Sequence, residues 1–192
     1  MAVAEGRARS CLFAVLAGAL VAALSACAAE DVPVPTPPPE LSAAILRSAA
    51  YFSQHVDERE IRLANGVFRD TARRVAVFFQ PEYAAGDLDS DGVPDAAVVL
   101  ATTTGGSGTF LDLALVLNRD GRPVAAATRF LGDRVPVDRI RIVEGEIQVD
   151  LTMHGPADPM CCPSLEVTRR FRYESGEVVE IGTGAEPADD SP

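Results

Sequence analysis

Turn signals recur along most of the chain at intervals of about eight to twelve residues, a spacing typical of all-β domains. Apolar and β-branched residues fill the stretches between these turns. The clearest turn pairs are Asn65-Gly66, Asp120-Gly121, Glu144-Gly145 and Ser175-Gly176. Because such pairs join neighbouring antiparallel strands, we expect a mainly β domain, an antiparallel meander curled into a barrel or sandwich to bury one face. The expected strands cover residues 61–63, 67–68, 75–79, 96–104, 109–118, 123–131, 137–143, 146–153, 165–173 and 177–181.

Two stretches differ from the regular pattern. Residues 41–51 begin with Ala43, Ala44, Ile45 and Leu46, which favour a short N-terminal helix. Residues 96–104 are almost continuously apolar at their centre, so we expect this strand to be buried on both faces.

The N-terminal residues follow a secretory plan, with Arg7 and Arg9 ahead of an apolar run over residues 11–24. The run is too short for a normal membrane span, and it ends in Leu24-Ser25-Ala26-Cys27, which resembles the lipobox of bacterial lipoproteins. That resemblance implies cleavage before Cys27 and lipidation of its sulfur. It also implies export to a membrane, and Ala28 favours the periplasmic face of the outer membrane if the cell is Gram-negative. A plain signal peptide is the alternative.

The chain therefore divides into a signal peptide (residues 1–26), a lipidated cysteine with a proline-rich tether (27–40), a β-rich globular domain (41–181) and a disordered acidic tail (182–192). The formal net charge of −11 argues against a nucleic-acid partner, because phosphate binding needs a basic face. An acidic chain gains nothing electrostatically from an anionic membrane, so the N-terminal lipid is the expected contact with the bilayer.

Residues 86–95 hold the most specific internal motif, with aspartates at positions 1, 3, 5 and 9 of a loop that starts at Asp87 and with Gly92 after the third. Calcium takes six to eight oxygen ligands, and this spacing can wrap one ion. Residue 12 of the loop is Val98 rather than Glu, which excludes an EF-hand; the motif resembles the loops of FG-GAP and VCBS repeats instead. We expect a structural calcium site, with a solvated turn as the alternative. The expected ligands are Asp87, Asp89, Asp91, Asp95 and the backbone carbonyl of Val93.

A second motif, at residues 153–163, contains the adjacent cysteines Cys161 and Cys162. Once Cys27 is lipidated, these are the remaining thiols of the exported chain, and the compartment is oxidising. Three interpretations stay open. The pair forms a structural clamp, as a vicinal disulfide or two buried thiols; it exchanges thiols; or it binds a soft metal together with His154 and Met160.

No catalytic set is apparent in the sequence. His55 lies among acidic and basic residues, which predicts a solvated surface position, and Arg169, Arg170 and Arg172 predict a charged exposed face. We therefore expect a non-enzymatic domain.

Several motifs together look like a family of uncharacterised bacterial lipoproteins. They are the lipobox, the aspartate motif, the Thr104-Gly105-Gly106-Ser107-Gly108 turn and the Asp158…Cys161-Cys162-Pro163 stretch. Residues 158–164 are also similar to the LppP/LprE lipoproteins of actinobacteria. The resemblance implies an exported, β-rich protein and no particular substrate. The first hypothesis is a lipid-anchored binding or structural domain with a calcium-stabilised loop, and another envelope protein is a candidate partner. The alternative is a thiol-redox or soft-metal-handling envelope protein that uses Cys161 and Cys162.

Overall fold

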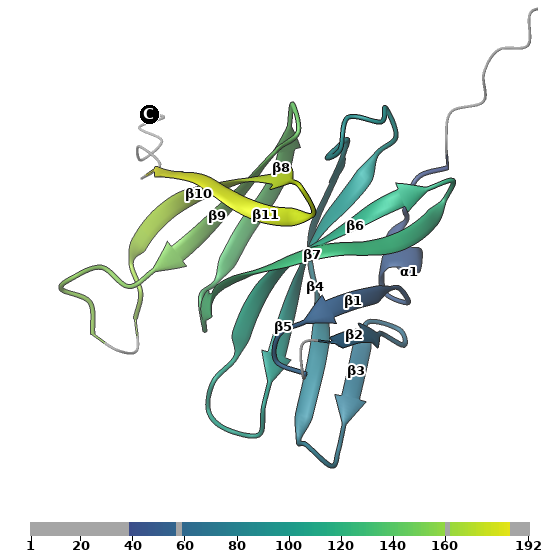
Figure 1. Cartoon of the computed structure of the whole chain (residues 1–192). Helices are drawn as coiled ribbons and strands as arrows, with labels where there is room; N and C mark the ends of the chain where they lie inside the picture. Colours follow the sequence, from purple (N-terminus) through teal and green to yellow (C-terminus); the bar gives the residue numbers. More distant parts are fainter. Residues whose placement is uncertain (1–38, 57–58, 160–161, 185–192) are drawn as a thin grey trace, which may run out of the picture. The chain divides into compact units, whose positions relative to one another are not determined.

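The computed structural model describes residues 39–56, 59–159 and 162–184. Within these ranges the chain forms one short helix and a succession of antiparallel strands (Figure 1). In chain order the elements are α1 (Ala43–Leu46), β1 (Ala50–Ser53), β2 (Arg59–Arg62), β3 (Val67–Asp70), β4 (Val75–Gly86), β5 (Asp95–Thr103), β6 (Phe110–Arg119), β7 (Arg122–Asp133), β8 (Val137–Val143), β9 (Glu146–Met153), β10 (Leu165–Glu174) and β11 (Glu177–Gly184).

The strands form three antiparallel sheets. β1 and β2 pair with each other, β3 to β7 form a five-stranded sheet in chain order, and β8 to β11 form a four-stranded sheet in chain order. One sheet is curled into a half-barrel. The expected mainly β, antiparallel meander is therefore confirmed, including the expected short helix near its start.

The predicted glycine pairs form the tight turns. Asn65, Asp120, Glu144 and Ser175 have φ between 51° and 54°, and each is followed by a glycine with φ between 75° and 88°. Two successive residues with positive φ are the signature of the hairpin turn whose twist matches that of the flanking strands. At Asp120, Glu144 and Ser175 these local signals join paired neighbouring strands and set their register. The hairpin expected at Asn65-Gly66 is wrong, because β2 pairs with β1 and β3 pairs with β4, and the turn closes only an isolated bridge between Ala64 and Val67.

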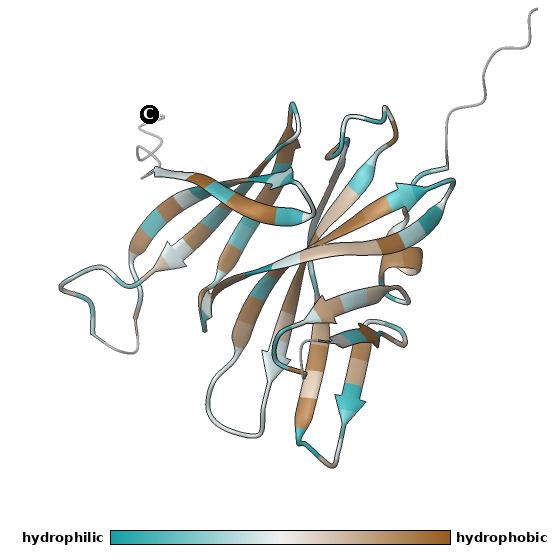
Figure 2. Ribbon diagram, in the orientation of Figure 1, coloured by the Kyte–Doolittle hydropathy of each residue, from teal (hydrophilic) through white to brown (hydrophobic). Residues whose placement is uncertain are grey.

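The five-stranded sheet is buried on both faces at its centre, because β5 and β6 are buried along almost their whole length. Ala97, Val99 and Leu113 point toward the four-stranded sheet and share a core with β8 to β11. Val98 and Leu100 point the other way, into a second core that is closed by α1, β1 and β2. Each fully buried valine or leucine contributes about 1.5–3 kcal/mol. Figure 2 shows the hydrophobic residues that continue across these central strands.

The two larger sheets also meet at their edges. At one edge Gly86 of β4 lies so close to β8 that an added Cβ would come within 2.5 Å of Ile142. On the other side Arg169 of β10, which lies between β9 and β11, donates from Nη1 to the backbone oxygen of Leu131 in the edge strand β7, at 2.8 Å.

The N-terminal layer, formed by α1, β1 and β2, contains less helix than the sequence predicts. The helix ends at Leu46, and Ala50 already belongs to β1, so residues 41–51 are only partly helical. Tyr51 explains the change: its ring is buried in the second core, its backbone pairs with Ile61, and its hydroxyl donates to the backbone oxygen of Leu46 at 2.7 Å. Aromatic residues favour strands where they can pack on a neighbouring surface.

The C-terminal strand is longer than predicted. β11 continues to Gly184, so residues 182–184, which the sequence places in the tail, still pair with β10. The remainder of the expected tail, the signal peptide and most of the tether lie outside the described residues.

Candidate functional site

The aspartate loop, residues 87–95, connects β4 to β5. Its two ends are joined because Gly86 pairs with Asp95 across the two strands. Leu88 is only 4% exposed and packs into the core between the two larger sheets. The loop is therefore fixed to the domain at both ends and at one point within it.

The loop is also bound by its own carboxylates. Asp87 accepts hydrogen bonds from the backbone N–H of Asp91 at 3.2 Å and of Gly92 at 2.9 Å, and Asp91 accepts from Val93 at 2.8 Å. Gly92 has a φ of +82°, a conformation that glycine adopts without strain. These side-chain-to-backbone bonds are the ones expected for the solvated turn, the alternative to a calcium site, and the calcium site itself stays a prediction.

Asp95 is the most deeply buried of the four carboxylates, with no exposed surface. Its Oδ2 accepts from the backbone N–H of Leu88 at 2.9 Å and its Oδ1 from that of Asn118 at 2.8 Å. Burial raises the pKa of Asp95, and the neighbouring carboxylates of Asp89 and Asp91 act in the same direction. A cation at this position would offset both effects.

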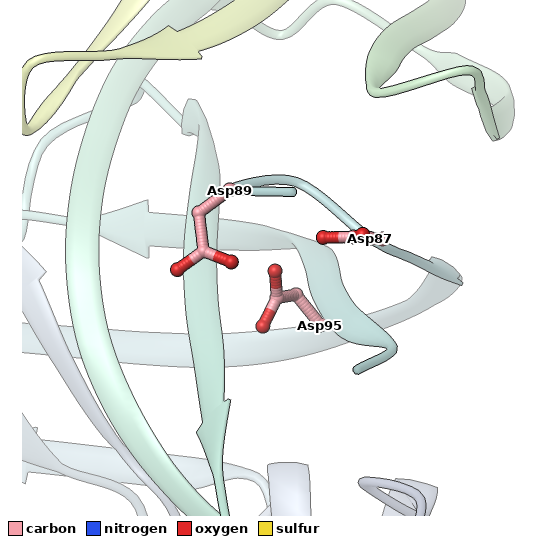
Figure 3. A group of neighbouring side chains, drawn as sticks. All are labelled: Asp87, Asp89 and Asp95. Carbon is pink, nitrogen blue, oxygen red and sulfur yellow. The ribbon is translucent and has the colours of Figure 1, made fainter. Parts of the chain in front are cut away.

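Three of the predicted ligands converge. Asp87, Asp89 and Asp95 each present one carboxylate oxygen, and these oxygens all lie within 4.8 Å of one another. Figure 3 shows the three side chains turned toward a common space. Asp91 is not a member of this group, and Val93 lies in the same loop with its N–H bound to Asp91.

Arg119, at the end of β6, accounts for the position of Asp91. Its Nη1 donates to Asp91 Oδ2 at 2.6 Å, and its Nη2 pairs with Oδ2 of Asp89. The other oxygen of Asp89, Oδ1, is buried and accepts no hydrogen bond from any described residue. One arginine therefore neutralises part of the loop and leaves one buried carboxylate oxygen without a partner. The sequence did not indicate Arg119, which lies 28 residues beyond Asp91.

The cysteine motif lies in the connection between β9 and β10. Asp158 fastens this connection, because it accepts hydrogen bonds at 2.7 Å from the backbone N–H of Gly155 and from both N–H and Oγ of Ser164. The donors from Gly155 and Ser164 lower the pKa of Asp158. Cys162 is disulfide-bonded. Cys161, Met160 and Cys27 lie outside the described residues, so the vicinal bond, the soft-metal set and the lipidation site stay predictions. His154 is exposed.

A second polar cluster was not predicted. His55 is not on a solvated face: its side chain is 17% exposed, and its Nε2 lies 3.2 Å from Oδ2 of Asp112 in β6. Asp112 is 2% exposed, and its Oδ1 accepts from Nε2 of Gln54 at 2.7 Å. Burial raises the pKa of Asp112, while Gln54 and His55 act against that shift.

Two aromatic rings contact the imidazole of this pair. The imidazole of His55 stacks on Phe110 with the ring centroids 4.8 Å apart, and it meets Phe130 edge-on at 6.0 Å. The signal in the sequence was Asp112 itself, a carboxylate within the otherwise apolar run of β6. No local pattern could indicate that His55 is its partner, because His55 follows β1 and is distant from Asp112 in the sequence.

The arginines of β10 divide into two kinds. Arg170 and Arg172 are about half exposed, as predicted, and lie near Glu146. Arg169 was predicted wrongly: it is 12% exposed and bonds Glu180 through two nitrogens, at 2.9 and 2.7 Å. A two-point pair of this geometry is among the stronger hydrogen-bonded contacts in proteins, and it joins β10 to β11.

Among the described residues, no helix has the length and hydropathy that crossing a bilayer requires. No protein-family model, curated protein or solved structure matches the chain. The function must therefore be inferred from the chain's own residues.

Proposed function

We propose that the chain is a lipid-anchored cell-envelope protein whose β domain is a non-enzymatic binding or structural module with a calcium-stabilised loop. The anchor rests on the lipobox-like sequence that ends at Cys27. Replacement of Cys27 by alanine is expected to release the protein from the detergent phase in a phase-partition assay, and unchanged partition would contradict the anchor.

The observation that carries the calcium site is the buried Oδ1 of Asp89, which has no hydrogen-bond partner among the described residues and belongs to the converging carboxylates of Asp87, Asp89 and Asp95. A buried carboxylate oxygen without a donor is costly, and a hard cation satisfies it. In their ionised forms the four aspartates of the loop and Arg119 carry three uncompensated negative charges. Calcium would remove two of them.

The site favours a structural role. Asp95 is fully buried and already accepts hydrogen bonds from the backbone of Leu88 and Asn118, so its carboxylate has a structural role in the domain. A cation that joins Asp95 to Asp87 and Asp89 would fasten the β4–β5 connection. We expect the binding partner of such a membrane-anchored domain to be another envelope protein.

The direct test is the melting temperature of chelator-treated full-length protein with and without calcium. Calcium at about one hundred times its dissociation constant would add about 2.7 kcal/mol to the free energy of unfolding. For a chain of this size that corresponds to a rise of about 5–10 °C in melting temperature. Magnesium is expected to give a smaller rise, because it demands a stricter geometry.

Asp89→Asn is expected to abolish the calcium-dependent rise. Glu174→Gln is a matched control, because it removes one negative charge from a half-exposed side chain on β10, in the other large sheet. An equal rise in both variants would mean that calcium acts on the overall charge and would contradict the site.

The second candidate function is thiol exchange by Cys161 and Cys162, and the disulfide of Cys162 favours it over the soft-metal alternative, which needs a thiolate. Peptide mass spectrometry with alkylation before and after reduction would identify the partner of Cys162. A partner other than Cys161, or a bond that resists mild reductants, would leave only a structural role for this disulfide.

A further inference from the structure

Asn118 joins two parts of the chain that are distant in sequence. Its side chain is 1% exposed, and its Nδ2 donates to the backbone oxygens of Pro39 at 2.8 Å and of Pro94 at 3.1 Å. Its Oδ1 accepts from the backbone N–H of Gly121 at 2.7 Å. One buried amide thus connects the aspartate loop, the β6–β7 turn and the start of the described domain.

The same turn contacts the carboxylates of the loop. The backbone N–H of Asn118 donates to Asp95 at 2.8 Å, and the next residue, Arg119, pairs with Asp89 and Asp91. Asp95 is therefore both a member of the converging carboxylate group and an acceptor for the residue that holds Pro39. A change in the position of Asp95 acts directly on Asn118.

The lead-in segment, residues 39–41, has a close-fitting place on this turn. Gly121 has a φ of +79°, and an added Cβ would lie 2.6 Å from Cγ of Pro39. Only glycine combines this positive φ with the absence of a Cβ, so only glycine fits here without displacing Pro39. Leu41 is 5% exposed and packs into the core closed by α1, β1 and β2. The chain therefore enters the domain along one defined path beside the aspartate loop.

We propose that the aspartate loop and the lead-in segment form one cooperative unit, in which a cation bound by Asp87, Asp89 and Asp95 tightens the docking of residues 39–41 through Asn118. The cation part rests on the proposed calcium site. By linkage, a docked lead-in segment must raise the affinity for the cation by the same factor that the cation stabilises docking. For a protein anchored through Cys27, this coupling lets the cation fix where the tether leaves the domain.

The test compares two glycine variants of the full-length protein. Gly121→Ala strains the β6–β7 turn and pushes against Pro39, whereas Gly176→Ala strains the β10–β11 turn, where φ is +88° and no atom lies within 4 Å of the added Cβ. Both variants carry a similar backbone penalty at positive φ. They differ in that Gly121 contacts Pro39 and donates its N–H to Oδ1 of Asn118, the two contacts that the proposal assigns to the cooperative unit.

Hydrogen exchange followed by mass spectrometry reports on both regions at once. Gly121→Ala is expected to speed exchange in residues 41–46 and also in residues 88–95, and to weaken calcium binding about fivefold or more. Gly176→Ala is expected to change neither region. In the unaltered protein, calcium is expected to slow exchange in residues 41–46.

The outcomes separate the two proposals. If the unaltered protein binds no calcium, the proposed calcium site is contradicted. Faster exchange of the aspartate loop in Gly121→Ala would even then support the structural coupling between this loop and the lead-in segment. If Gly121→Ala loosens residues 41–46 and leaves both the exchange of residues 88–95 and the calcium affinity unchanged, the cooperative unit is contradicted.

Discussion

Asp95 and Asp112 are both almost completely buried, yet they are stabilised in opposite ways. Asp95 accepts from two backbone N–H groups, those of Leu88 and Asn118. Asp112 contacts two side chains, Gln54 and His55, from the N-terminal layer. Backbone donors cannot become acceptors, whereas an amide can rotate and an imidazole can change tautomer. The two regions should therefore respond differently to the same chemical change.

The largest expected effect is that of Asp95→Asn. The new amide keeps the shape of the side chain and one acceptor oxygen, but its NH2 group faces a backbone N–H, so one of the two buried donors loses its acceptor. We expect the free energy of unfolding to fall by about 3 kcal/mol, measured by urea denaturation in the presence of a chelator. If the free energy of unfolding falls by less than about 1 kcal/mol, the surroundings of Asp95 rearrange to satisfy the amide. Asp95 would then not differ from Asp112 in how it tolerates the change.

His55→Phe is expected to have the next largest effect. Phenylalanine preserves the stacking on Phe110 and removes the contact with Asp112. Among the described residues, the buried carboxylate then keeps the hydrogen bond from Gln54. The expected loss at neutral pH is about 2 kcal/mol.

This loss should depend on pH in a defined direction. Burial raises the pKa of Asp112, so the folded state binds the proton more tightly than the unfolded state. Protonation of Asp112 therefore adds stability as the pH falls through the raised pKa, and a buried neutral carboxyl group loses less than a buried carboxylate when a polar partner is removed. The penalty of His55→Phe should shrink on acidification, measured by denaturation from neutral to mildly acidic pH. If His55→Phe becomes more destabilising as the pH falls, the raised pKa of Asp112 is not the cause of the pH dependence.

Glu180 gives the opposite pH dependence and serves as a control. Its pairing with Arg169 lowers the pKa of Glu180, so the stability that the pair contributes is lost as the pH falls through that lowered value. Glu180→Gln should therefore be most destabilising at neutral pH and approach the unaltered protein in strong acid.

Asp112→Asn should cost less than Asp95→Asn. The new side chain can still accept from Gln54, and its amide N–H can donate to Nε2 of His55, so its partners adapt. We expect a loss below about 1 kcal/mol in the same urea experiment. If both asparagine variants lose the same stability, the distinction between backbone and side-chain partners is wrong.

Arg119→Gln is expected to have the smallest effect on stability. Arg119 is 44% exposed, and ion pairs at such positions contribute about 0–1 kcal/mol. Its removal leaves the loop more negative, so calcium affinity should rise while the calcium-free protein is slightly less stable. Weaker calcium binding would mean that Arg119 supports the geometry of the loop rather than competing with the ion.

The two regions also differ in how far the sequence predicted them. The aspartate loop is local, because its ligands and its glycine fall within ten residues, and the spacing alone indicated three carboxylates that the structure brings together. The strands and three of the four glycine hairpins were predictable for the same reason, whereas the pairing of β2 with β1 instead of β3 was not. The His55–Asp112 contact joins residues 57 positions apart, and Arg119 lies 28 to 30 residues from its partners. Only the packing of distant strands creates such pairs.

The measurement that tests the account most directly is a calorimetric titration of chelator-treated full-length protein with calcium, made in parallel on Asp89→Asn. The account predicts a single saturable binding event, about one ion per chain, that the variant lacks. No binding in the unaltered protein, or equal binding in both, would contradict the calcium-stabilised loop. Its carboxylates would then be held, within the described part of the chain, by Arg119 and the backbone N–H groups.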